Sequence, residues 1–177
     1  MDASPAPDLA VSGKPPPPAF VDDSLWRRAM TEKDDIDLAS LADREGASGL
    51  LNAVEQGGDV GRTALKALPY AHDAPVALGR LAELSLLTRE ASQLMVIQTI
   101  LEIALTRPAF GEPVDEGGRQ ACTMALLHIA RDEKSADRSR ALAISALRLP
   151  AFVEVLGTHE LPTKFDSPAP SSSLPQR

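Results

Sequence analysis

Between residues 22 and 160, alanine, leucine and isoleucine recur every three or four positions, and short polar breaks interrupt them. This spacing is typical of amphipathic α-helices, because residues three and four positions apart share one helical face. The stretch 60–86 contains two such faces in succession: Val60, Ala64, Leu65 and Leu68, then Leu78, Leu81, Ala82 and Leu84 to Leu86. No segment shows the sustained alternation of a strand. The pattern therefore predicts an all-α fold.

Helix starts and stops are marked along the same region. Starts are predicted at residues that favour the N-cap position, namely Asp22 or Asp23, Asp59, Asp73, Thr88 and Ser135. Stops are predicted where glycine or proline interrupts the pattern, at Gly57-Gly58, Pro69 and Pro108. By this interpretation, His72 and Asp73 only form the turn between two helices.

The two ends of the chain differ in composition from the region between them. Residues 1–21 contain Pro5, Pro7 and the run Pro15 to Pro18, and residues 161–177 are rich in proline and serine. Such segments bury too little apolar surface to offset chain entropy. We therefore expect a disordered leader at 1–21, a helical domain at 22–160 and a disordered tail at 161–177. The proline run is interpreted as a stiff spacer, with docking to an aromatic groove as the alternative.

The predicted helices form three antiparallel pairs. First helices are expected near 47–57, 74–87 and 118–131, and second helices near 60–70, 90–105 and 136–149. Two of the predicted second helices have similar sequences, GRTALKALPYA at 61–71 and SRALAISALRLPAF at 139–152. Each has an arginine, two Ala-Leu steps and a proline-containing turn. This repetition indicates a recurring helix-pair unit.

The order Arg62, Ala64-Leu65, Ala67-Leu68, a short turn and then Ala74-Pro75 resembles HEAT repeats and the related armadillo repeats, over about residues 46–152. This chain departs from the pattern because Pro69-Tyr70 replaces the expected glycine and the spacing of roughly 40 residues is irregular. The resemblance implies a short curved α-solenoid whose second helices line a concave, partner-binding face without catalysis. An irregular helical bundle is the alternative architecture.

The sequence also predicts which helices lie at the end and at the centre of the stack. The segment SLWRRAM is expected to form an N-terminal capping helix, with Trp26 packed beneath it. The helix 91–105 is expected to be central and largely enclosed, because its apolar arc is wide. A second stripe of this helix, narrower than the apolar arc, comprises Ser92, Met95, Gln98, Thr99 and Glu102.

Composition excludes several kinds of function. The formal net charge of −7 and the six scattered aromatic residues disfavour nucleic-acid binding, which relies on lysine, arginine and base stacking. The longest apolar run, Leu94 to Leu105, is interrupted by polar residues and shorter than the roughly 20 residues of a membrane span. No glycine-rich phosphate loop occurs. We expect no cofactor.

Metal and thiol chemistry are also disfavoured. His72, His128 and His159 lie in separate segments without the helical spacing of a metal site, so we expect structural or exposed histidines. Cys122 is the only cysteine and shares a helical face with Leu126 and Ile129, which predicts a buried, inert thiol. The sequence offers no catalytic, cofactor-binding or metal-binding set, and we predict that the protein is not an enzyme.

Surface recognition remains as the predicted function. If the second helices line one face, its candidate partner-binding residues are Arg62, Lys66, Gln98, Glu102, Arg138 and Arg148. We predict a scaffold that binds another protein or peptide, with an exported or lipid-anchored helical-repeat protein as the alternative. A helical-repeat enzyme or enzyme accessory is a further alternative, although a DNA-acting version would be basic.

The expected location follows from the start of the chain. MDASPAPDLAVSGKPPPP has neither the basic nor the apolar region of a signal peptide, so the chain as written is expected in the cytoplasm. A periplasmic or lipid-anchored location follows instead if Met1 replaces a removed export signal.

Overall fold

The computed structural model describes residues 23–32, 34–109, 114–157, 159 and 161. The predicted leader at 1–21 lies outside this part of the chain, and so does the predicted tail at 161–177 except for Leu161. All regular structure in the described residues is helical, so the all-α prediction is confirmed. The α-helices are α1 (Ser24–Thr31), α2 (Asp35–Gln56), α3 (Gly58–Ala67), α4 (Leu78–Leu87), α5 (Glu90–Ala109), α6 (Glu116–Arg131), α7 (Asp137–Leu147) and α8 (Pro150–Leu156), with 3-10 turns η1 (Leu68–Tyr70) and η2 (Ala74–Ala77).

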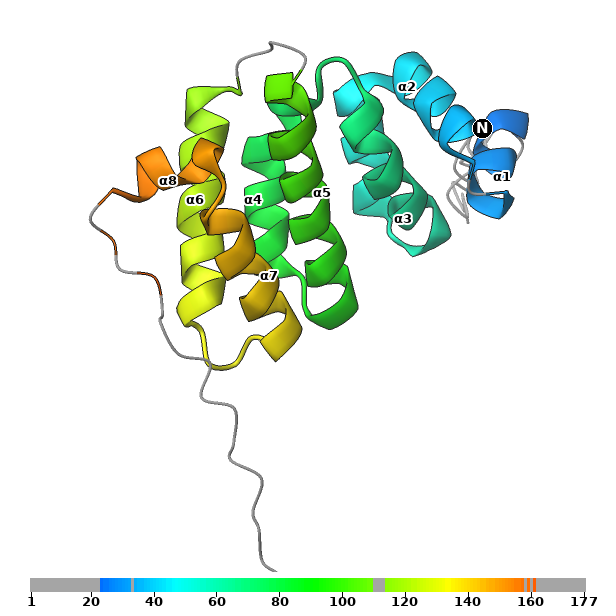
Figure 1. Ribbon diagram of the computed structural model, residues 1–177. Helices are drawn as coiled ribbons and strands as arrows, with labels where there is room; N and C mark the ends of the chain where they lie inside the picture. Colours follow the sequence, from blue (N-terminus) through cyan, green and yellow to red (C-terminus); the bar gives the residue numbers. More distant parts are fainter. Residues whose placement is uncertain (1–22, 33, 110–113, 158, 160, 162–177) are drawn as a thin grey trace, which may run out of the picture.

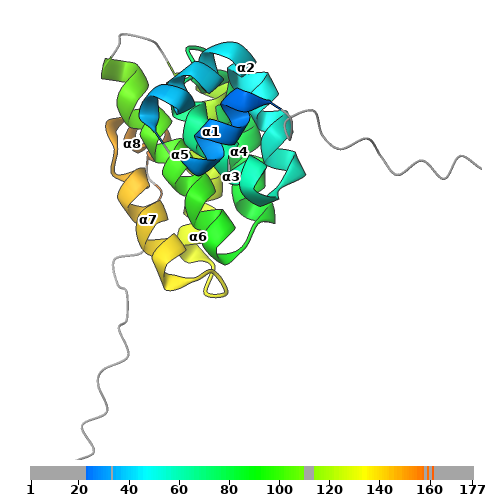
Figure 2. The same cartoon turned by 90° about the vertical axis from the view of Figure 1, so that its right-hand side faces the viewer.

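Helices that follow one another in the chain pack as pairs: α2 with α3, α4 with α5, and α6 with α7 (Figure 1). The pairs also contact one another in a regular way, because α4 packs against α6 and α5 packs against both α7 and α3. Second helices therefore lie beside second helices, whereas among the first helices α4 lies beside α6 and α2 meets the second pair through η2. Figure 2 shows the same arrangement from the side of α1, which covers the end formed by α2 and α3.

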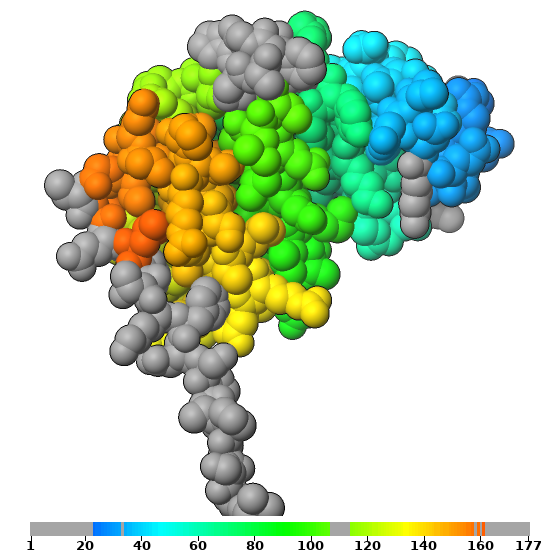
Figure 3. Space-filling model, in the orientation of Figure 1, coloured from blue at the N-terminus to red at the C-terminus, as the bar shows by residue number. Residues whose placement is uncertain are grey.

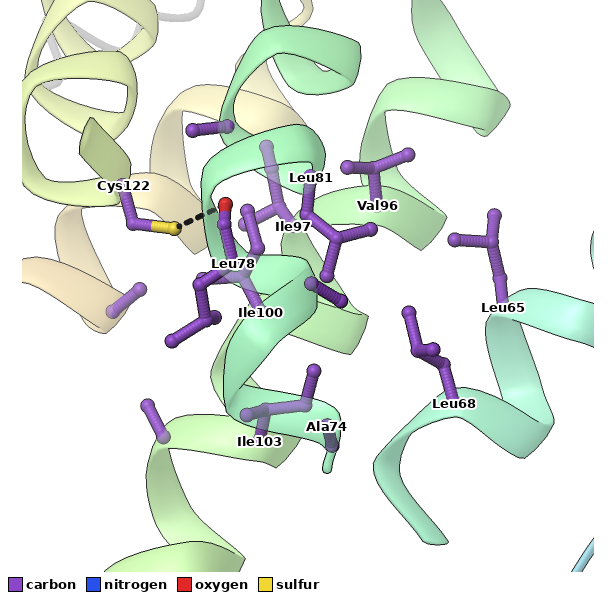
Figure 4. Close-up of a cluster of buried hydrophobic side chains, with 14 of the residues drawn as sticks. Leu65, Leu68, Ala74, Leu78, Leu81, Val96, Ile97, Ile100, Ile103 and Cys122 are labelled. Atoms are coloured by element: carbon purple, nitrogen blue, oxygen red, sulfur yellow. Dashed lines mark hydrogen bonds between the residues drawn. The ribbon is translucent and has the colours of Figure 1, made fainter. Parts of the chain in front are cut away.

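The core is mostly aliphatic, and Trp26 and Phe152 are its fully buried aromatic side chains. Leucine and isoleucine side chains from α3, α4 and α5 meet in its centre (Figure 4), where Leu78, Leu81, Ile97, Ile100 and Ile103 are fully buried. Burial of each such side chain stabilises the fold by roughly 1.5–3 kcal/mol. The enclosed position predicted for the helix 91–105 is thus confirmed on its apolar arc.

The helices α4 and α6 approach each other closely through small side chains. Gly118 of α6 lies against Leu78, and a Cβ atom added to this glycine would be 2.9 Å from the Leu78 Cβ. One turn later, the Cys122 thiol donates a hydrogen bond to the Leu78 carbonyl oxygen at 3.2 Å (Figure 4). Both contacts involve the first turn of α4, which places the N-terminal halves of the two helices side by side.

The N-terminal helix α1 is fastened to α2 by polar contacts around a buried indole. Trp26 is fully buried, as predicted, and its Nε1 donates to Glu45 Oε1 at 3.3 Å. Asp23 is the N-cap of α1, accepting from the backbone N–H of Leu25 at 2.9 Å, and its Oδ2 lies 2.9 Å from Arg44 Nη1. The hydrogen bond from Arg44 is the main cause that lowers the pKa of the Asp23 carboxyl.

The helix α2 is kinked at Gly46, which has a left-handed φ of 65° that favours glycine. The kink frees the backbone N–H of Ala47, and Asp73 Oδ1 accepts a hydrogen bond from this group at 2.9 Å. Asp73 therefore caps the second half of α2 from a turn that is distant in sequence. Asp73 does hold the predicted N-cap position, before η2, but its side chain makes no cap hydrogen bond there and serves α2 instead.

Several predicted boundaries differ from the structure. Asp59 lies inside the first turn of α3, whose N-cap is Gly57, because the positive φ of this glycine reverses the chain directly. Ser135 is not the N-cap of α7, since Ala136 holds that position and the Ser135 hydroxyl donates to Asp132. Thr88 is the C-cap of α4, and its hydroxyl donates to the Leu84 carbonyl oxygen at 2.7 Å.

Helix ends were also misplaced by the sequence pattern. The helix α5 continues through the predicted stop at Pro108 to Ala109. The predicted helix near 60–70 ends earlier than expected, because its last residues, with Pro69, form the 3-10 turn η1. The sequence pattern predicted only a turn after the third helix pair, but residues 150–156 form the short helix α8. Pro150 suits the first position of this helix.

Candidate partner-binding site

The second helices α3, α5 and α7 form one layer, and their outward stripes make the candidate site. In the space-filling view, α7 and α5 lie side by side on the face toward the viewer, with α3 beyond α5 (Figure 3). All six predicted residues are exposed and belong to these helices or the residue that ends α7: Arg62, Lys66, Gln98, Glu102, Arg138 and Arg148. We call this set the second-helix face.

The α3 part of the face borders a hollow beside α1. Arg62 forms an ion pair with Asp59 one turn earlier, whereas Lys66 makes no ion pair with the described residues. A cavity of about 350 Å³ opens next to them, with Ala29, Met30 and Leu38 as its apolar walls. The cationic end of Lys66 therefore lies at the edge of a partly apolar hollow.

The α5 part of the face is acidic and partly shielded. Gln98 and Glu102 are four residues apart and both exposed on one stripe. Partial burial raises the pKa of the Glu102 carboxyl. Thr99, which the sequence placed on the same stripe, is instead buried, and its hydroxyl lies 2.9 Å from the Met95 carbonyl oxygen of its own helix and 3.2 Å from the Leu65 carbonyl oxygen of α3. Thr99 is thus a structural residue, because a hydroxyl can be buried when it finds an acceptor.

Tyr70 is a member of this face that the sequence analysis missed. It belongs to η1 and is 42 % exposed. Its pKa is raised, first by burial, then by a hydrogen bond with Asp35, and last by the negative charges of Asp35 and Glu102. The signal in the sequence was the spacing of Arg62, Lys66 and Tyr70, each four residues apart on a helical stripe.

The α7 part of the face is a cationic strip. Arg138, Ala141, Ser145 and Arg148 are exposed and fall on one side of the helix, opposite the buried Ser139, Ala143 and Leu147. The two arginines at its ends form no ion pair with any described residue. The small side chains between them leave this surface flat.

A second surface feature, which the sequence analysis also missed, lies on the opposite layer. An open apolar hollow of about 450 Å³ runs between α4 and α6, with Leu86 and Met124 exposed along it. Its floor consists of small residues, Gly79, Ala82, Ala121 and Ala125. Small residues recurring three or four positions apart on two helices were the available signal.

The histidines and the cysteine considered for metal or thiol chemistry lie apart from one another. His72, His128 and His159 are exposed on separate segments, and within the described residues no group of three or more His, Cys, Asp and Glu side chains could hold a metal ion. Cys122 is fully buried, and burial raises the pKa of its thiol to about 12. The prediction of a buried cysteine is confirmed. Within the same described part of the chain, no helix is both long and apolar enough to cross a membrane.

Comparison with known proteins gives no relative. No protein-family model, no curated protein and no solved structure matches this chain.

Proposed function

We propose that this chain is a non-catalytic scaffold that binds a partner protein or peptide through the second-helix face. The observation that carries the proposal is the presence of exposed polar stripes on three consecutive second helices of one layer. Such a layer offers a broad surface built on rigid elements, which suits recognition of another protein.

The HEAT-like architecture belongs to the same proposal. Its support is the packing of α4 on α6 and of α5 on α7, which is the like-on-like stacking of helix pairs in a solenoid. The first pair is joined differently, because α2 meets the second pair through η2, and α3 meets it through α5. A short, irregular HEAT-like stack accommodates both observations.

Site-specific photo-crosslinking tests the proposed face. The photoreactive amino acid benzoyl-phenylalanine is placed, one position at a time, at Lys66, Gln98 and Arg138 in the full chain. Matched controls carry it at Asn52 and Gln120, which are exposed on α2 and α6 of the other layer. We expect one common partner to be crosslinked from the three test positions and not from the controls.

Charge changes provide an independent arm of the same experiment. The triple variant Arg62→Glu, Gln98→Glu and Arg138→Glu is expected to weaken capture of that partner, because it changes three exposed side chains of one face. Unchanged capture by this variant, or crosslinks formed only from Asn52 and Gln120, would contradict the proposal.

A further inference from the structure

We infer that the segment docking on this protein is acidic and lies along α7, between Arg138 and Arg148. This inference rests on the proposed function and specifies the chemistry of the partner. It follows from how the positive charges of the described chain are distributed and neutralised.

Most arginines of the fold are already neutralised by nearby carboxylates. Arg28 pairs with Asp37 at 3.2 Å, and Arg80 pairs with both Glu55 and Glu83. Arg138 and Arg148, in contrast, are exposed and make no ion pair with the described residues. Their charges are therefore available to an incoming carboxylate.

Two acidic residues near this strip in sequence are already engaged. Asp137 lies 3.7 Å from Arg140, which belongs to the same helix. Glu154 of α8 lies 3.2 Å from Arg119 of α6. These pairs hold the Asp137 and Glu154 carboxylates, and neither Arg138 nor Arg148 forms an ion pair with a described carboxylate.

The spacing of the two arginines sets the reach of the ligand. They are ten positions apart on one helical stripe, which corresponds to about 15 Å along the axis. An extended peptide spans this length in about five residues. Ala141 and Ser145 lie between the arginines and are small, so a peptide backbone can pass over them.

The helix α5, which packs against α7, carries partly exposed apolar side chains beside its acidic Glu102. Leu105 of α5 is 51 % exposed, and Leu101 is half-buried. The docking segment is thus expected to combine two carboxylates, four or five residues apart, with apolar side chains between them. The net charge of −7 means that no general attraction for acidic molecules exists, so that binding must arise from the local strip.

Fluorescence anisotropy with defined peptides tests this inference on the full chain. The probe is a fluorescein-labelled peptide of glutamate, alanine and leucine, with two glutamates placed five residues apart. The comparison probe has lysine at both glutamate positions. We expect the acidic peptide to bind and the lysine peptide not to bind.

The double variant Arg138→Gln and Arg148→Gln removes two positive charges from the strip. We expect its affinity for the acidic peptide to fall by about fivefold, the combined effect of two exposed ion pairs of ordinary strength. The control variant Asn52→Asp and Gln120→Glu changes the net charge by the same amount on the other layer and is expected to bind like the unaltered protein. Circular dichroism checks that both variants remain folded.

Equal binding of the two peptides, no loss in the arginine variant, or equal loss in the control would overturn the inference. Its failure is distinguishable from failure of the proposed function. A partner that is crosslinked from the second-helix face, but whose affinity ignores both arginine substitutions, contradicts only the acidic ligand. Absence of crosslinks from that face contradicts the scaffold itself.

Discussion

The Asp73 carboxylate accepts a hydrogen bond from the backbone N–H of Ala47, although the two residues are 26 positions apart in the chain. This contact ties the turn after η1 to the kink of α2. It replaces a local N-cap at a point where Gly46 interrupts the helical backbone. A side chain from the turn between η1 and η2 thus completes a helix of the first pair.

Replacement Asp73→Ala should lower the free energy of unfolding by about 1–2 kcal/mol, because it leaves the Ala47 N–H without its acceptor. Asp73→Asn should cost less, since the amide oxygen can still accept. Asp59→Ala is the matched control, because the exposed Asp59 caps no helix with its side chain. Urea denaturation measures all three, and equal losses at positions 73 and 59 would refute the role of Asp73.

Replacement Gly118→Ala should destabilise the fold by about 1–3 kcal/mol through overpacking. The added methyl group would meet the Leu78 Cβ at 2.9 Å. Gly117→Ala is its neighbour control, and its Cβ meets only the Asp115 carboxylate at 3.6 Å. Since alanine favours helix, this control should be neutral or slightly stabilising. Thermal unfolding of both variants decides the matter, and a stable Gly118→Ala protein would contradict the close packing of α4 and α6.

The Cys122 thiol should be unreactive in the folded protein. Its burial and its raised pKa of about 12 leave almost no thiolate at pH 8. We expect a disulfide reagent such as dithionitrobenzoate to label it only after unfolding in urea. The control is Met124→Cys in a Cys122→Ala background, because position 124 is half exposed and should react quickly. Rapid labelling of native Cys122 would show that α6 opens.

The ion pair between Asp23 and Arg44 should make stability depend on acidity. The pKa of Asp23 is lowered from the ordinary value of 3.8, chiefly by the hydrogen bond from Arg44. The stabilising contribution is therefore present above the pKa of the unfolded chain and is lost as pH falls through the folded value. Arg44→Gln should reduce this loss between pH 5 and about pH 3. Denaturation at both pH values tests this, and identical pH profiles would argue against the pair.

The sequence was sufficient for the features that depend on local pattern. Helical periodicity located the three helix pairs, and the aspartate before SLWRRAM is the N-cap of α1. Burial of Trp26 and Cys122 followed from their apolar helical faces. These features depend on residues within one or two turns, which is the range over which periodicity and capping act.

Features set by distant partners could not be predicted. The acceptor of the Ala47 N–H is 26 residues away, and one of the two acceptors near the Thr99 hydroxyl is 34 residues away. A polar residue on a helical stripe is therefore exposed or buried according to a neighbour that periodicity does not identify. The six predicted residues are exposed, but which of them keep an unpaired charge depends on ion pairs such as Arg62 with Asp59.

The contact between the first two helix pairs is partly polar. The Thr99 hydroxyl of α5 lies 3.2 Å from the Leu65 carbonyl oxygen of α3 and 2.9 Å from the Met95 carbonyl oxygen of its own helix. Lys66 and Gln98 project from these same two helices. The separation of two candidate partner-binding side chains is therefore set by how closely α3 and α5 pack around one buried hydroxyl.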